Sequence, residues 1–412
     1  MSHPPNEPAI DRPPVTADVA PPGAAEDAGQ TRLGRFKLPK ATLRAYTMLF
    51  ALVLIWFFFQ WATIDKDHPY GLFLSAVNLS NLFKQTAVTG VLAVGMLMII
   101  VTGQIDLSVG SLIGLAGGVA AMTQDWGLAA SLGSAIAVGL AIGALQGSLV
   151  AYANIPAFIV TLGGLLAWRG VVFILVKSRT IPINLPAFRS IGLDYIAPVI
   201  GWAIAVIAIA AIVWITIRRN QARRRHGLSV SGMGPTAARI FFPAILIIAF
   251  IYMMNSHAGV PNPVIILLAV ALAGAFLTQN TTFGRYLYAI GGNPDAARLS
   301  GISLRRYILW TFCLMGVLAG LASLMETARL GAADPNAGVS KELDAIAACV
   351  IGGTSLMGGR GTVFGALLGA LIMASLDNGM SQLNAERYTQ DIVKGVVLVT
   401  AVGFDMLGRR KG

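Results

Sequence analysis

Charged residues are scarce in this chain of 412 residues: Asp, Glu, Lys and Arg together make up 12% of it, whereas hydrophobic residues make up 56%. A soluble globular domain carries about 25% charged residues. So few charges cannot cover the surface of a soluble protein of this length. The composition therefore excludes a soluble globular protein and predicts an integral membrane protein.

Cysteine and histidine are also rare. The two cysteines, Cys313 and Cys349, lie in apolar runs, which excludes a disulfide framework and a CxxC metal site. The four histidines fall in the N-terminal tail or in connecting segments, so we expect no bound metal. The chain contains no GxSxG, HExxH or GxxxxGK[ST] motif. We therefore expect a protein that is not an enzyme and that does not hydrolyse ATP itself.

What the chain does contain is a series of twelve apolar segments, which we compared with the ~20 residues that a membrane-spanning helix needs. The breaks at 103–107 and 357–361 are too tight for ordinary loops and indicate broken or re-entrant helices, which are tolerated where the backbone faces protein. The expected fold is an all-α polytopic membrane protein with about 10–12 transmembrane helices. The segments are 45–64, 85–102, 108–123, 128–151, 156–176, 197–217, 240–254, 262–278, 307–325, 344–357, 361–380 and 391–407.

The positions of the basic residues predict the orientation of these segments. If the N-terminus lies in the cytoplasm, twenty of the thirty lysines and arginines fall in cytoplasmic segments. Such a bias favours a topology with both termini inside. The net charge of +11 is then a topology signal, and we expect the lipid bilayer and no nucleic acid as a partner.

Two further patterns concern the organisation of the chain. Residues 1–40 hold eight of the nineteen prolines and predict a disordered cytoplasmic leader, followed by a transmembrane domain over 41–412. Residues 103–114 (GQIDLSVGSLIG) and 358–369 (GGRGTVFGALLG) share three glycines and a leucine at an offset of 255. One interpretation of this echo is that the chain contains two structurally related halves, as in many transporters. The other is a chance match between glycine-rich segments.

Asp106 is the most informative charged residue, because it lies between two apolar segments, where a carboxylate is costly. One interpretation makes it a cap of the helix over 107–123, with its oxygens accepting hydrogen bonds from free backbone N–H groups. The other makes it a pathway residue that binds solute or a proton, with Gln104 and Ser108 as further groups for a polyol. We favour the capping interpretation.

Residues 282–306, on the predicted cytoplasmic side, contain the pattern of a short capped helix. Asn293 is a suitable N-cap, Pro294 and Asp295 suit the first turn, and Gly301 is placed to end the helix. One interpretation is a linker between two spans. The other is a docking element, because a face of small residues lies beside a basic one. These residues are Ala296, Ala297, Ser300 and Arg298.

Three blocks of sequence carry a resemblance to a known family. Residues 103–111 (GQIDLSVGS) resemble the GGIDLSVGS signature of the permease subunits of bacterial ATP-binding cassette (ABC) importers for simple sugars, the ribose, galactose, arabinose and xylose group. Residues 288–302 (YAIGGNPDAARLSGI) are similar to the coupling segment of that family, and residues 349–362 (CVIGGTSLMGGRGT) to its C-terminal block. Gln104 departs from the pattern, because it replaces the second glycine of the signature.

The middle of the chain also departs from the family, which commonly shows about ten spans. Residues 180–260 read as an extra hairpin with a basic cytoplasmic loop over 218–239. Two added spans leave the flanking topology unchanged, in agreement with the distribution of basic residues. This enlarged middle most resembles the xylose-importer permeases, which makes xylose the favoured sugar.

The resemblance implies a mechanism with several partners in the bacterial inner membrane. Two permease copies would form a homodimeric pore, a periplasmic sugar-binding protein would deliver the monosaccharide, and a separate ATPase subunit would bind ATP and Mg. The implied ATPase-coupling residues are Gly291, Gly292, Asn293, Pro294, Asp295, Ala296, Ala297, Arg298 and Gly301. The expected residues of the substrate pathway are Gln104, Asp106, Ser108, Gly110, Thr354 and Ser355.

A function of another class stays open at this point. Asp106 and the internal echo are also compatible with a secondary transporter that works alone and is coupled to an ion or proton gradient. Uptake by this chain alone, driven by an ion gradient without ATP, would favour that alternative over an ABC importer subunit.

Overall fold

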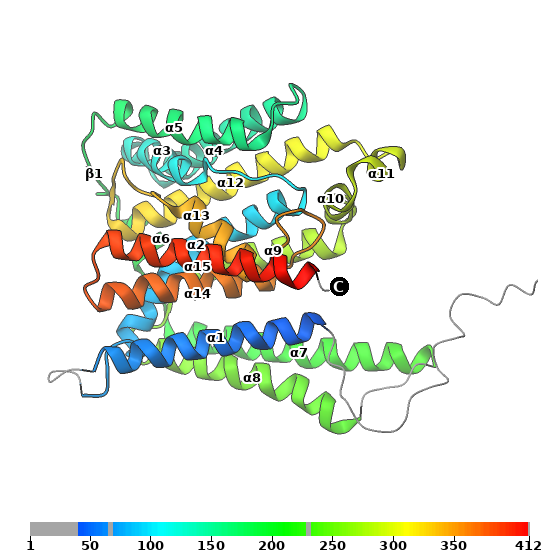
Figure 1. Ribbon diagram of the computed structural model, residues 1–412. Helices are drawn as coiled ribbons and strands as arrows, with labels where there is room; N and C mark the ends of the chain where they lie inside the picture. Colours follow the sequence, from blue (N-terminus) through cyan, green and yellow to red (C-terminus); the bar gives the residue numbers. More distant parts are fainter. Residues whose placement is uncertain (1–39, 65–68, 228–231, 411–412) are drawn as a thin grey trace, which may run out of the picture. The chain divides into compact units, whose positions relative to one another are not determined.

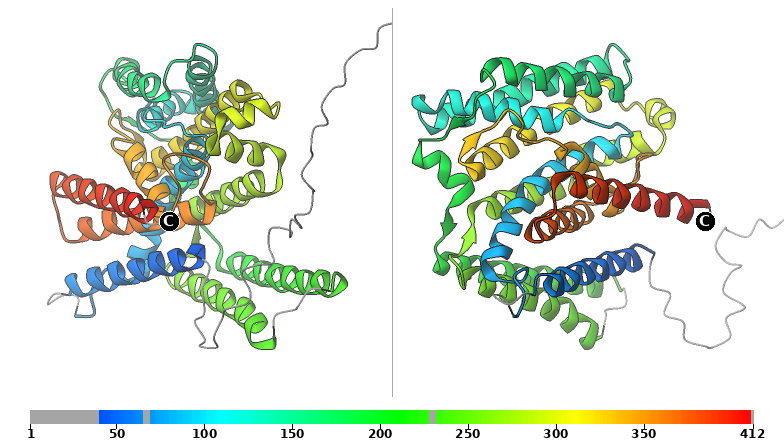
Figure 2. Two further views of the ribbon diagram at one scale, coloured as in Figure 1. Left: turned by 45° about the vertical axis from the view of Figure 1, so that its right-hand side comes forward. Right: turned by 60° about the vertical axis from the view of Figure 1, so that its left-hand side comes forward.

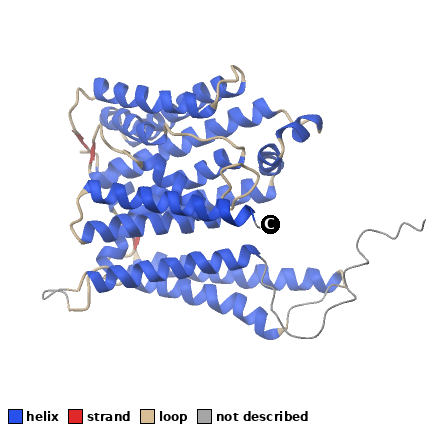
Figure 3. Cartoon of the chain, viewed as in Figure 1, coloured by secondary structure: helices blue, strands red, loops and turns tan. Residues whose placement is uncertain are grey.

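The computed structural model of the protein describes residues 40–64, 69–227 and 232–410. Almost all of this part is helical (Figure 3). Helices are the expected result, because lipid offers no partners for backbone polar groups and a helix pairs them internally. The α-helices are α1 (Lys40–Ala62), α2 (Ala76–Val101), α3 (Val109–Met122), α4 (Leu128–Ala151), α5 (Ala157–Leu175), α6 (Pro186–Leu193), α7 (Pro198–Arg225), α8 (Met233–Asn255), α9 (Asn262–Asn280), α10 (Thr282–Gly292), α11 (Pro294–Leu299), α12 (Leu304–Leu330), α13 (Lys341–Ile351), α14 (Val363–Gln382) and α15 (Arg387–Arg410).

The predicted all-α polytopic architecture is confirmed. Each of the twelve apolar segments contains a helix, and eight helices of the described part are long and apolar enough to cross a membrane. The chain divides into two compact units, residues 1–43 and residues 44–412. The second unit contains all of the sites considered below. The predicted leader falls on residues 1–40, of which 1–39 lie outside the described residues.

Helix α2 is the centre of the second unit. It packs against α9, α12, α13 and α14, as the two turned views in Figure 2 also show. Of its most apolar stretch, 94% is buried inside the protein, against 11% for α7. Because α2 consists of small and aliphatic residues from Thr86 onward, this part can be enclosed by protein on all sides. The helices that pack against α2 are therefore held in fixed positions relative to it.

Both predicted helix breaks are present. After α2, the chain turns at Gly103, which has a φ of +78°, and α3 begins six residues later. After α13, the chain turns at Gly358, which has a φ of +86°, before α14. The left-handed conformation favours glycine. The two aligned positions of the internal echo thus share one backbone feature, as two related halves would require.

Short strands connect the loops at the other end of the helices. Strand β1 (Ile181–Pro182) pairs antiparallel with β4 (Ala332–Ala333), and β2 (Tyr195–Ile196) pairs antiparallel with β3 (Val260–Pro261). A single-turn 3₁₀ helix, η1 (Gln124–Trp126), precedes α4. These pairings attach α6, which lies between β1 and β2, to the ends of α8 and α12. Figure 1 shows β1 and α11 at opposite ends of the helix bundle.

The predicted loop over 218–239 is wrong in its bounds. Helix α7 continues to Arg225 and α8 begins at Met233, so five arginines of this segment lie on the last turns of α7 and Arg239 lies near the start of α8. Arginine, alanine and glutamine are good helix formers, and basic side chains complement the C-terminal end of the helix dipole. The extra hairpin itself is present, because α7 and α8 pack against each other.

Candidate functional site

Asp106 stabilises the turn that precedes α3. It is 3% exposed, and its Oδ1 accepts hydrogen bonds from the backbone N–H of Ser108 at 2.8 Å and from the Ser108 hydroxyl at 2.7 Å. The residue at the N-cap position is Ser108, whose own side chain does not cap the helix. The carboxylate therefore pairs a backbone N–H that the helix leaves free, as the capping interpretation requires.

The same turn is attached to two neighbouring helices. The Ser108 hydroxyl lies 3.0 Å from the side-chain amide of Gln146 in α4, and the Thr161 hydroxyl of α5 donates to the carbonyl of Ile105 at 3.2 Å. Gln104 is half-buried. Gly110, at the start of α3, is so close to Gly338 and Glu342 that a side chain there would collide with both. This part of the predicted pathway is thus a tightly packed helix start.

Substitutions at Asp106 separate the two interpretations of this residue. We expect Asp106→Asn to retain transport within about twofold, because the amide oxygen can still accept both hydrogen bonds. Asp106→Ala removes the acceptor and is expected to cost about 1–2 kcal/mol of stability. Transport assays on membranes, with thermal unfolding of the purified protein, measure both effects. A carboxylate that binds solute or a proton would instead lose its function in Asp106→Asn.

A second cluster joins both helix breaks to the cytoplasmic segment. We call it the glycine junction and define it as Gly103, Gly291, Gly358 and Gly359. The N–H of Gly359 donates to the carbonyl of Val101, the last residue of α2, at 2.9 Å. A side chain at Gly358 would meet the backbone of both Gly103 and Gly291. Three segments that are far apart in the sequence therefore meet backbone to backbone.

The contact surface of Gly291 shows how closely these segments approach. A methyl group at this position would collide with the carbonyl of Val101 and with the N–H of Gly359. The hydroxyl of Tyr288, one turn earlier in α10, donates to the carbonyl of Gly361 at 2.8 Å. Helix α10 is thus fixed both to the end of α2 and to the segment before α14. By contrast, a methyl group at Gly292 would meet no atom within 4 Å.

Helix α11 has the caps that its sequence predicts. The Asn293 side chain accepts a hydrogen bond from the N–H of Ala296 at 3.0 Å, and Pro294 is the first helical residue. Gly301 has a φ of +80° and donates to Arg298. Together with the bond from Ile302 to Ala297, this pairing forms a Schellman motif. Asp295 and Arg298 form an exposed ion pair of 3.3 Å on the same helix.

The exposed face of α11 differs from the predicted one in one position. Ala297 is 4% exposed, so it packs inside this chain and is not part of a surface for a partner. Ala296 and Ser300 are exposed as expected. The most prominent side chain is Leu299, which is 86% exposed. Leu299 is not among the predicted residues, because position alone does not distinguish an inward from an outward leucine in so short a helix.

Thr354 and Ser355 lie in the segment between α13 and α14. Both are buried, at 0% and 3% exposed. The N–H of Ser355 donates to the carbonyl of Arg360 at 2.9 Å, which closes the segment into a compact turn, whereas the hydroxyl of Thr354 has no hydrogen-bond partner within the described part of the chain. These two residues lie near the glycine junction, because Gly361 contacts Thr354 closely. They do not meet Asp106 in a common hydrogen-bonded cluster.

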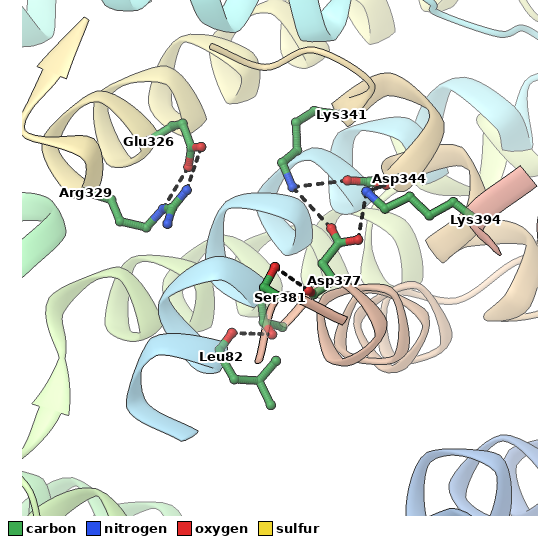
Figure 4. Close-up of polar contacts among 9 residues, drawn as sticks. Leu82, Glu326, Arg329, Lys341, Asp344, Asp377, Ser381 and Lys394 are labelled. Carbon is green, nitrogen blue, oxygen red and sulfur yellow. Dashed lines mark hydrogen bonds and ion pairs between the residues drawn. The ribbon is translucent and has the colours of Figure 1, made fainter. Parts of the chain in front are cut away.

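A network of four charges joins the last three helices (Figure 4), with one side chain 2% exposed and the other three 17–19% exposed. Lys394 of α15 contacts Asp344 of α13 at 3.0 Å and Asp377 of α14 at 2.8 Å. Lys341 contacts the same two carboxylates at 3.1 and 3.9 Å. The network is neutral as a whole. Such alternation is what allows charges to be buried, since each one is next to charges of opposite sign.

The sequence contained a signal for this network that we did not use. Asp344 and Asp377 both lie within predicted apolar segments, where ionisable residues are rare and usually have a partner. Spacing along the chain does not identify that partner, because Lys394 lies on a separate helix. A neighbouring pair, Glu326 and Arg329 of α12, forms a second ion pair at 2.8 Å. Within the described ranges, no three His, Cys, Asp or Glu side chains are grouped as metal ligands.

Comparison with known proteins identifies the family. Residues 78–402 match the family model "Branched-chain amino acid transport system / permease component". The chain is 44% identical over 379 residues to a xylose transport system permease protein of Haemophilus influenzae, covering 91% of this chain and 100% of the relative. It is 43% identical to the xylose transport system permease protein of Escherichia coli, covering 91% and 94%. The ribose import permease protein of Escherichia coli is 36% identical, covering 91% and 98%.

No solved structure matches the chain. The family model covers most of the described helices, from the first turn of α2 into α15, and therefore includes the glycine junction, α11 and the charge network. The resemblance to the permeases for simple sugars is confirmed by the named relatives. The chain therefore belongs to the family of transport-system permease components, as a multi-pass protein of the inner membrane.

Proposed function

We propose that this protein is the permease subunit of an ABC importer that carries a pentose, xylose, from the periplasm to the cytoplasm. The observation that carries the proposal is the identity of 43–44% to xylose permeases over at least 94% of their length, against 36% for a ribose permease. The xylose permeases and the ribose permease are aligned over similar shares of this chain, so the higher identity is what favours xylose. The proposal thus has two parts, the role as an importer subunit and the choice of xylose as the sugar.

In this proposal, ATP and Mg are bound by a separate ATPase subunit that docks on α11. The support comes from the shape of this helix: it is capped at both ends, mostly exposed, and carries Leu299 as a prominent apolar side chain. A leucine that is 86% exposed offers apolar surface that a groove on a partner would remove from water. The exposed ion pair of Asp295 and Arg298 lies in the polar rim around it.

Movement of α11 would reach the membrane through the glycine junction. Since Gly291 contacts the end of α2 and Gly359 at backbone distance, α10 cannot shift without moving both helix breaks. A second permease copy would complete the pore, and a periplasmic sugar-binding protein would deliver xylose. The turn that holds Gln104, Asp106, Ser108 and Gly110, together with Thr354 and Ser355, would then act by changing its packing as access alternates.

Substitution of Leu299 tests the docking role. We expect Leu299→Ser to weaken binding of the ATPase about tenfold, because burial of a leucine side chain contributes about 1.5–3 kcal/mol and 1.4 kcal/mol corresponds to a factor of ten. The measurement is the affinity of the purified permease for the ATPase subunit in detergent. Leu330→Ser is a matched control, because Leu330 is also exposed, at 48%, but lies at the other end of α12. Equal binding by both variants would refute the docking role of α11.

Reconstitution tests the function as a whole. Proteoliposomes with the permease and its ATPase, supplied with the binding protein from outside, are expected to accumulate xylose only when ATP is enclosed. Accumulation of ribose but not xylose would overturn the choice of sugar and retain the importer. Accumulation by the permease alone under a proton gradient, without ATP, would replace the importer by a secondary transporter.

A further inference from the structure

A polar cavity of about 330 Å³ lies between α2, α12 and α14, at the end of the bundle opposite to α11. It is formed by the first turns of α2 and the last turns of α12 and α14, which places it on the predicted periplasmic side. Its volume is within the range of about 300–1,000 Å³ that is usual for small-molecule sites. Six of its lining side chains are uncharged and polar, five of them amides: Asn78, Asn81, Gln85, Asn378, Ser381 and Gln382.

Part of this polar lining is held rigidly by its own hydrogen bonds. The Asn78 amide donates to the side-chain oxygen of Asn378 at 2.8 Å and to the carbonyl of Phe73 at 2.8 Å. The oxygen of Asn78 accepts from the Gln382 amide at 2.8 Å. Three amides from two helices thus form a chain in which each member fixes the next. Such a chain keeps its remaining polar atoms in defined positions.

The remaining polar atoms leave capacity for a ligand. The NH₂ group of Asn378 and the oxygen of Gln382 make no hydrogen bond with other described residues. The side chains of Asn81 and Gln85 likewise have no partner within the described part of the chain. Each amide supplies donors and an acceptor, as a sugar hydroxyl does. Polar groups in a membrane protein that are not used by the fold are candidates for binding solute.

One of the two cations in the cavity wall has a carboxylate partner, whereas the other keeps its charge among neutral acceptors. Arg329 forms its ion pair with Glu326, and among the described residues that line the cavity none is acidic. Lys84 donates to the carbonyl of Leu193 at 2.9 Å and to the hydroxyl of Tyr195 at 3.0 Å. Burial by itself raises the pKa of Tyr195, but the hydrogen bonds of Ser80 and Lys84 and the charge of Lys84 lower it below its usual value. The wall therefore presents one ammonium group beside several amides, and both kinds of group can form hydrogen bonds with the hydroxyl groups of a polar ligand.

We propose that this cavity is a subsite for the transported sugar within each permease, where a neutral monosaccharide with several hydroxyl groups binds after its release from the binding protein. The proposal rests on the proposed function and adds the residues that receive the sugar. Gln85 of α2 and Asn378 of α14 both line this cavity. A sugar that bridges these helices would link substrate to the helix that carries Asp377 of the charge network.

The test uses the complete importer in proteoliposomes and measures xylose transported per ATP hydrolysed. For Gln85→Leu we expect this ratio to fall about tenfold, because loss of a hydrogen bond to a substrate hydroxyl leaves it unpaired. Leucine has a similar volume, and the Gln85 side chain makes no hydrogen bond to other described residues, so folding is retained. Gln221→Leu is the control, because Gln221 lies on the exposed part of α7, far along the chain from the cavity. It is expected to keep the wild-type ratio.

The possible outcomes are distinguishable. If Gln85→Leu lowers ATP hydrolysis and transport together, so that their ratio is unchanged, the cavity serves another purpose, such as docking of the binding protein, and the proposal is overturned. The same holds if both variants behave like the wild type. If the wild-type importer transports no xylose at all, the proposed function fails first. The subsite is supported if xylose transported per ATP hydrolysed falls in Gln85→Leu and stays at the wild-type value in Gln221→Leu.

Discussion

Replacement of Gly291 by alanine is expected to reduce ATP-driven uptake of xylose by about 5- to 140-fold, since forced overpacking costs about 1–3 kcal/mol and 1.4 kcal/mol is a factor of ten. The added methyl group has no free space, because it meets the carbonyl of Val101 and the N–H of Gly359. Helix α10 must then separate from α2, and the bond between Gly359 and Val101 is lost with it. Uptake and ATP hydrolysis in proteoliposomes measure the effect.

The neighbouring glycine provides the control for this experiment. Gly292→Ala introduces the same methyl group in the same helix, where it meets no atom within 4 Å. Alanine is the better helix former by about 0.8–1.0 kcal/mol, so this variant is expected to transport like the wild type. Since both residues have the same chemistry, only the contacts across the glycine junction distinguish them. Equal loss in both variants, or in neither, would show that the junction does not transmit motion.

Removal of one charge from the charge network is expected to have the second large effect. Lys394→Met leaves Asp344 and Asp377 with Lys341 as their only partner in the network, so one negative charge is uncompensated. Breaking a fully buried ion pair costs about 3–5 kcal/mol and an exposed one at most about 1 kcal/mol, so we expect a cost of about 2–3 kcal/mol for this partly exposed network. We expect a marked fall in the thermal stability of the purified protein, measured by unfolding in detergent. We also expect α15 to become accessible to proteases, since Lys394 attaches it to α13 and α14.

A double variant separates charge balance from packing. Lys394→Met combined with Asp377→Asn leaves Lys341 and Asp344 as a neutral pair at 3.1 Å. Because no unpaired charge remains, most of the lost stability is expected to return. Lys394→Arg keeps the charge and is expected to unfold close to the wild-type temperature. A double variant as unstable as Lys394→Met would show that the side chain of Lys394 acts through its packing alone.

Local sequence was sufficient to predict several elements correctly. The twelve apolar segments each contain a helix, because hydrophobicity over about 20 residues is itself the condition for spanning a membrane. The caps of α11 were predicted as well, since Asn293 and Gly301 act on residues within a few positions of themselves. The same holds for the break at Asp106, whose carboxylate bonds a residue two positions away.

Contacts between distant parts of the chain could not be predicted in this way. The glycine junction joins residues from three regions, and nothing in the spacing of Gly103, Gly291 and Gly358 indicates that they meet. Likewise, whether Ala297 or Leu299 faces outward depends on which side of α11 lies against this chain. The loop predicted over 218–239 failed for the opposite reason, because charge was taken to end a helix that its helix-forming residues continue.

By itself, the sequence determined that this is a helical membrane protein of a sugar-permease type and where its helices break. These properties depend on composition and on interactions over a few residues. Only the tertiary structure decided that the breaks meet α10, that Lys394 closes a neutral network, and that amides of α2 and α14 face one cavity. The physical reason is that such contacts form between helices, and helix packing selects partners by shape and charge across hundreds of residues.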